Sequence, residues 1–141
     1  MPVFSDIFRL GGEELNPGMP WPLYFDRQGF PIPGDGSSPP SVVWGRMFED
    51  RDYRIVRQDL LLDGSMLSTV WLGLDHSWGL RTPLIFETMY FKEPGDGGSE
   101  LPFPDPRDGN EETGTLRYSN EEEARATHER IFQLLKKSQL H

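Results

Sequence analysis

Apolar and polar residues alternate along the middle of the chain and predict consecutive strands. The alternation starts in residues 53–62 (YRIVRQDLLL), continues in residues 66–76 (MLSTVWLGLDH) and returns in residues 83–92 (PLIFETMYFK). Residues 63–65 (DGS) and 77–82 fit the short turns that such strands need. Strands that follow one another in this way pair as an antiparallel meander.

The pattern changes to helical spacing near the C-terminal end. One stripe of this expected helix holds Ala124, His128, Ile131 and Leu135. Ser119, three positions before Glu122, has the spacing of a capping box. The stripe must be buried, so we expect the helix to pack on the sheet, to which residues 115–119 (TLRYS) offer a further strand. The predicted fold class is α+β, an antiparallel meander of three to five strands with a C-terminal amphipathic helix packed on one face.

Glycine and proline interrupt the segments before this sheet. Residues 1–22 show no period and are predicted to form an irregular N-terminal arm. Residues 23–33 (LYFDRQGFPIP) have the pattern of a small hairpin in which Gly29 supplies a positive φ. Residues 42–52 fit either a strand or a short helix, and we favour a helix over residues 43–50.

A long loop separates the third expected strand from the C-terminal helix. Residues 93–114 carry seven acids, one base and many glycines and prolines. Loops of this length are typical of functional or disordered segments, and the composition favours disorder. We therefore divide the chain into the arm, residues 1–22, and a single α+β domain, residues 23–141, that carries this acidic loop as a mobile segment.

The composition excludes several classes of function. A formal net charge of −9 argues against direct binding of nucleic acid, which needs lysine and arginine at the phosphates. The chain has no cysteine, which removes disulfides, thiolate metal sites and cysteine nucleophiles. We find no apolar run of membrane-spanning length and no secretory signal pattern, so we expect a cytoplasmic protein without membrane contact.

The run Asp75-His76-Ser77 contains the residue types of a hydrolase triad. Neighbours on a strand point to opposite faces, so these three cannot form a triad by adjacency. A site could still form from Asp75 or His76 with Glu87 and His128 if Gly73 pairs with Glu87 across the sheet. The alternatives are that Glu87 faces solvent and that His128 is a core histidine with its polar partners. We predict no metal site, no cofactor and no catalytic residue.

The tryptophans offer a second kind of site. If the helix covers the Val70 face of its strand, Trp71 and Trp78 are partly exposed and would anchor an interface, including a homodimer. The alternative, which we favour, is that residues 21–44, with Trp21 and Trp44, fold back and cover the face that carries Thr69, Trp71 and Gly73. The candidate binding residues are Trp71, Asp75, His76, Trp78, Arg81, Glu87 and His128. The candidate acidic surface comprises Asp105, Asp108, Glu111, Glu112, Glu121, Glu122 and Glu123.

Four stretches of the chain carry a resemblance to a known family. They are LYFDRQGFPI (23–32), STVWLGLDHSWG (68–79), PLIFETMYF (83–91) and RYSNEEEARATHE (117–129). With their order and spacing, they resemble a family of small uncharacterised proteins encoded by tailed bacteriophages and prophages. The departure is Thr127 before His128, where the family tends to have glycine. The resemblance implies a phage or prophage origin, an accessory role and a place in the bacterial host cytoplasm, with no catalytic residue to carry over.

Three functional hypotheses follow. The first is a non-enzymatic phage accessory protein that binds a host or phage protein, in one version as an acidic inhibitor of a host nucleic-acid-handling or defence system. The second is a small-molecule-binding protein or enzyme with a pocket near Asp75, His76 and Glu87. The third is a virion or assembly component.

Overall fold

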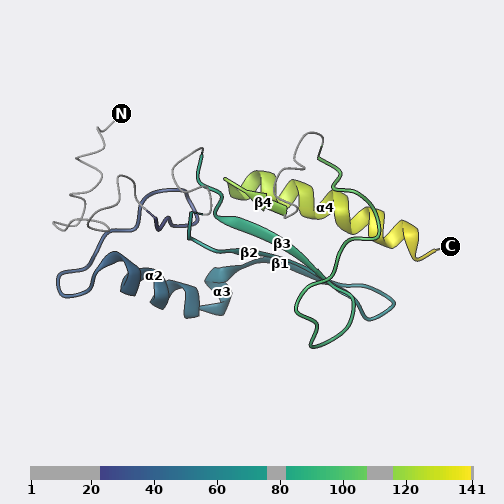
Figure 1. Ribbon diagram of the computed structural model, residues 1–141, viewed down its shortest axis with the longest axis horizontal. Helices are drawn as coiled ribbons and strands as arrows, with labels where there is room; N and C mark the ends of the chain where they lie inside the picture. The colour runs from purple at the N-terminus through teal and green to yellow at the C-terminus, as the bar shows by residue number, and fades with distance from the viewer. Residues whose placement is uncertain (1–22, 76–81, 108–115, 141) are drawn as a thin grey trace.

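The computed structural model describes residues 23–75, 82–107 and 116–140 and confirms the α+β meander. Its elements are α2 (Pro40–Glu49), α3 (Arg51–Arg54), β1 (Ile55–Leu60), β2 (Met66–Trp71), β3 (Phe86–Phe91), β4 (Leu116–Tyr118) and α4 (Glu121–Ser138). The four strands form one antiparallel sheet in the order β1-β2-β3-β4. Helix α4 contacts all four strands. Figure 1 shows α4 lying along the strands, with α2 on the other side of them in that view.

Strand β1 begins later than the alternation predicts. Asp50 accepts hydrogen bonds from the backbone N–H groups of Asp52 and Tyr53 and thereby caps a helical turn, α3. Tyr53 is therefore helical, and the prediction that it starts a strand is wrong. The register of β1 also shifts between Ile55 and Arg57, which places Arg57 opposite Thr69.

Helix α4 covers the face of β2 that carries Leu67, Thr69 and Trp71, which are all buried. Because β3 pairs Phe86 with Trp71 and Thr88 with Thr69, these β3 side chains share that face. The condition under which Trp71 would be exposed, a helix on the Val70 face, is therefore not met. Val70 and Met66 lie on the opposite face and stay half-buried.

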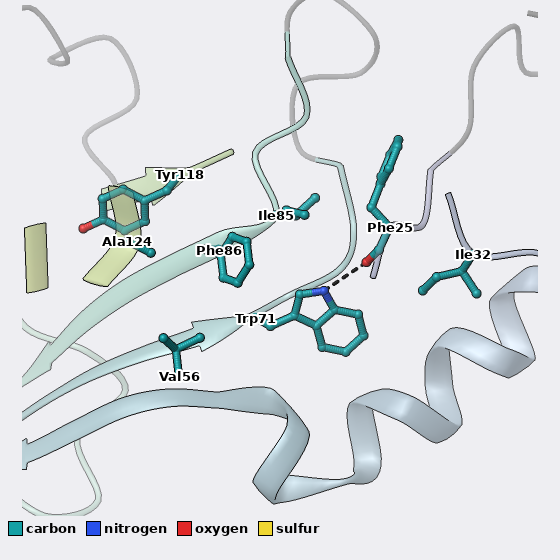
Figure 2. Close-up of a cluster of buried hydrophobic side chains, with 8 residues drawn as sticks. All are labelled: Phe25, Ile32, Val56, Trp71, Ile85, Phe86, Tyr118 and Ala124. Atoms are coloured by element: carbon teal, nitrogen blue, oxygen red, sulfur yellow. Dashed lines mark hydrogen bonds between the residues drawn. The ribbon is translucent and has the colours of Figure 1, made fainter. Parts of the chain in front are cut away.

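Trp71 is fully buried at the junction of the sheet with the N-terminal elements. Its Nε1 donates to the carbonyl oxygen of Phe25 at 2.9 Å, as Figure 2 shows. The ring of Tyr53 meets it edge-on, and the ring of Phe48 lies 6.3 Å away. Trp44 lies next to this contact and donates its Nε1 to the Leu72 carbonyl oxygen. The preferred prediction, that residues 21–44 cover this face, therefore holds at Trp71 and Gly73, whereas α4 covers Thr69 and Trp21 lies outside the described residues.

The smaller elements match the sequence patterns closely. Helix α2 spans Pro40–Glu49, so it begins three residues before the favoured range 43–50 and ends one residue before its end, and proline is tolerated in its first turn. The hairpin around Gly29 forms, with φ +91° at that residue. Helix α4 is capped by Asn120, whose side chain accepts from Glu123 N–H. The cap predicted at Ser119 is thus wrong by one residue, because Asn120 takes the extended conformation that a capping residue needs.

The described part of the long loop contacts the sheet. Ser99 N–H donates to the Tyr90 carbonyl, and Arg107 donates to the Arg117 carbonyl at 3.0 Å. The rest of the predicted mobile segment, residues 108–114, and the predicted arm, residues 1–22, lie outside the described residues.

Candidate functional site

A line of polar side chains crosses the interior between α4 and the sheet. Asp59 of β1 lies 2.8 Å from His128 Nε2, and His128 Nδ1 lies 2.7 Å from Thr69 Oγ1. Thr69 Oγ1 is 2.5 Å from Thr88 Oγ1, which accepts from the Tyr118 hydroxyl at 2.9 Å. Each of the four strands, and α4, thus supplies one side chain of this line. Of these five side chains, only that of Asp59 is partly exposed.

Chemistry fixes the direction of donation along this line. The ionised carboxylate of Asp59 can only accept, so His128 donates from Nε2 and accepts at Nδ1. Thr69 then donates to His128, and Thr88 donates to Thr69. Burial raises the pKa of Tyr118 to about 12, which keeps its phenol protonated as the first donor. Each buried polar group therefore has a partner, as a stable core requires.

The outer end of this line is an ion cluster at the surface. The Asp59 oxygen that meets His128 also accepts from Arg57 Nε at 2.7 Å, and Arg57 reaches Glu129 at 2.6 Å. Burial lowers the pKa of His128, and this effect outweighs the carboxylate of Asp59, which raises the same pKa. His128 is therefore neutral at neutral pH and acts as a connector between β1 and β2.

The residue types Asp59, His128 and Thr69 are those of a nucleophilic triad, and the distances fit. The hydroxyl of Thr69 is nevertheless fully buried and already bonded to two neighbours. A nucleophile needs room for a substrate at its oxygen, and helix α4 occupies that side. In this conformation the arrangement holds α4 to the sheet. Sequence reasoning identified His128 but missed Asp59, because only the register of β1 brings the two together.

The condition for a cluster of Asp75 or His76 with Glu87 and His128 is not met, and His76 lies outside the described residues. Val70, not Gly73, stands opposite Glu87, so the pairing on which the cluster depended is wrong. Glu87 instead accepts from Arg117 Nε at 2.9 Å, on the face turned away from α4. Asp75 is buried and its N–H donates to the Leu23 carbonyl. The candidates His76, Trp78 and Arg81 lie outside the described residues.

Most of the described acidic candidates form ion pairs with arginines of the same chain. Asp105 and Glu123 pair with Arg107, at 3.1 and 3.5 Å. Glu121 pairs with Arg27 at 2.7 Å and with Arg125 at 2.8 Å. Glu122 is exposed. The candidates Asp108, Glu111 and Glu112 lie outside the described residues. The acidic residues around the start of α4 therefore offer less free charge than the composition suggests.

A leucine-lined groove opens where the β1–β2 turn meets the end of α4. Its volume is about 330 Å³, and its lining consists of Leu60, Leu61, Leu62, Phe132, Lys136, Gln139 and Leu140. Leu60, Leu62 and Leu140 are 76%, 92% and 75% exposed. The sequence carried a signal for this surface that we did not use, namely the run LLL, which ends the alternation of the first strand. We call these seven residues the leucine groove.

No protein-family model, curated protein or solved structure matches this chain. The resemblance to phage proteins therefore stays a prediction. Within the described ranges, no helix is long and apolar enough to span a bilayer. The same residues include no group of three or more histidine or acidic side chains placed to hold a metal ion.

Proposed function

We propose that this chain is a non-enzymatic protein that works through contact with another protein chain, and that the leucine groove makes the contact. The observation that carries the proposal is the exposure of Leu60, Leu62 and Leu140 around one hollow. Single exposed leucines are ordinary on a protein surface, but apolar residues gathered at a groove mark interaction sites. The volume of the groove, about 330 Å³, lies at the lower end of the range of ligand cavities, and a few apolar side chains of a partner would fill it.

The closed state of the polar line supports the same proposal. The only described histidine with a carboxylate and a hydroxyl partner is sealed under α4, so hydrolysis at Thr69 has no entry for substrate. Of the residues named for the alternative pocket, Glu87 accepts from Arg117 and stands opposite Val70, and His76 and Trp78 lie outside the described residues. Contact with a protein through the leucine groove therefore needs no movement of α4, whereas catalysis at Thr69 would need α4 to move.

The resemblance to phage proteins adds a setting to this proposal. In that setting the chain is an accessory protein in the bacterial cytoplasm, and its partner is a host or phage protein. Inhibition of a host defence or nucleic-acid-handling system is one version, and it would rely on acids such as Glu122 that have no ion pair among the described residues. A virion or assembly role uses the same contact, and mass spectrometry of purified particles would detect it.

Photo-cross-linking tests the proposal directly. A benzophenone amino acid replaces Leu62 in the full chain, which is expressed in bacterial cells and irradiated. We expect a cross-linked product of higher mass that contains a second polypeptide. The matched control carries the same probe at Val42, which is exposed on α2 away from the groove. Equal products from both positions, or none from position 62, would overturn the proposal.

A further inference from the structure

We propose that the partner seated in the leucine groove is a second copy of this chain, related by a two-fold axis. This inference rests on the proposed function and names the occupant of its site. The groove carries protruding leucines and the hollow between them on the same patch. A two-fold contact requires this property, because each copy must present both the knob and the hole.

Opposite charges at the rim of the groove favour a second copy over other partners. Lys136 lines the groove, and Asp63 lies in the adjoining turn next to Leu62. Both are exposed. Lys136 lies over the ring of Phe132 and Asp63 accepts hydrogen bonds from Ser65, but neither forms an ion pair with another described residue. An acidic partner would meet Asp63 unfavourably, and a basic partner would meet Lys136 unfavourably. A second copy brings one charge of each sign beside its own leucines.

The open edge of the sheet lies at the same place. Among the described strands, β1 pairs only with β2, so its other edge is unpaired. In Figure 1 the β1–β2 turn and the C-terminal end of α4 lie at the same end of the molecule. The edge of β4 differs, because Arg107 donates to the Arg117 carbonyl there. An unpaired strand edge offers free backbone N–H and C=O groups to a second chain, and Leu60, at the end of β1, adds an exposed apolar side chain there.

Burial of leucine must drive this contact, because each copy carries a net charge of −9. The measurement is sedimentation velocity of the purified full chain over a range of concentrations, at physiological salt, where repulsion between distant charges is screened. We expect a reversible monomer–dimer equilibrium. Leu62→Glu should weaken it at least about tenfold, since burial of a leucine side chain is worth that factor. Val42→Glu, the matched control, should leave it unchanged.

A mixing experiment tests the two-fold arrangement itself. Lys136→Glu places two acids opposite each other in the dimer, and Asp63→Lys places two cations there. Each variant alone should therefore dimerise more weakly than the natural chain. In an equimolar mixture, the glutamate introduced at position 136 of one copy meets the lysine introduced at position 63 of the other. The natural Asp63 of the first copy meets the natural Lys136 of the second, so heterodimers should form. Circular dichroism of each variant verifies that it is folded.

The outcomes separate this inference from the proposed function. Dimers that survive Leu62→Glu, or variants that do not recover on mixing, would overturn the two-fold contact through the groove. A chain that stays monomeric at every concentration would overturn the second copy as occupant. If that monomer still cross-links at position 62 to a different protein in cells, the proposed function stands without this inference. If position 62 yields no product at all, both fail.

Discussion

Removal of one hydroxyl from the buried polar line should cost a large part of the stability of this fold. Thr69→Val keeps the shape of the side chain but deletes the oxygen that bonds His128 at 2.7 Å and Thr88 at 2.5 Å. His128 Nδ1 then lacks a donor and the Thr88 hydroxyl lacks its acceptor, both in the interior. A buried polar group without a partner costs about 1–3 kcal/mol. Two buried groups lose a partner in this way, so we expect a total of about 2–6 kcal/mol.

Urea unfolding followed by tryptophan fluorescence measures this change, with the slope m unaltered. Ser68→Ala is the matched control on the same strand, because its hydroxyl bonds only the exposed Gln58 side chain among the described residues, so it should cost less than about 1 kcal/mol. Thr69→Val combined with Thr88→Val should cost less than the sum of the single changes, since both delete the same bond. Equal effects of Thr69→Val and Ser68→Ala would refute the reasoning.

Three further predictions follow from other parts of the structure. Burial lowers the pKa of His128 below its unfolded value, so the unfolded chain takes up the proton first; the free energy of unfolding should fall from about pH 7 to pH 5, and His128→Gln should flatten that dependence in urea titrations. Gly73→Ala should destabilise by about 1–3 kcal/mol, because φ is +71° and a Cβ would lie 2.7 Å from Trp44 Nε1. Thermal melts measure this loss, and the control Gly64→Ala, with φ +88° and open space around the added Cβ, should lower the stability less. Asn120→Ala should lower the melting temperature by an amount equivalent to about 1 kcal/mol, through loss of the cap at Glu123 N–H.

The architecture could be predicted from the sequence because each element is specified locally. Alternation gave β2 and β3, and the stripe through His128 and Ile131 gave α4 and its buried side. The covered face of β2 could not be read in this way. Thr69 is polar by type, and its burial depends on the Thr88 hydroxyl of β3 and the His128 ring of α4, which only the folded chain brings close.

The candidate site was predicted only in part for the same reason. Register decides which side chains meet across a sheet, and one shift in β1 places Asp59 beside His128. The pairing of Gly73 with Glu87, on which a cluster with His128 depended, does not occur, because Val70 stands opposite Glu87. The leucine groove needed the position of Leu140 relative to the β1–β2 turn, which no local pattern contains.

Amide hydrogen exchange at low and high protein concentration tests the role of the leucine groove most directly. Association through the groove predicts slower exchange at high concentration in peptides covering residues 58–63 and 132–140, which hold its lining. Peptides from α2, residues 40–49, should exchange at the same rate at both concentrations. Identical exchange at both concentrations, or protection that appears in α2 and not beside Leu62 and Leu140, would contradict self-association through the leucine groove.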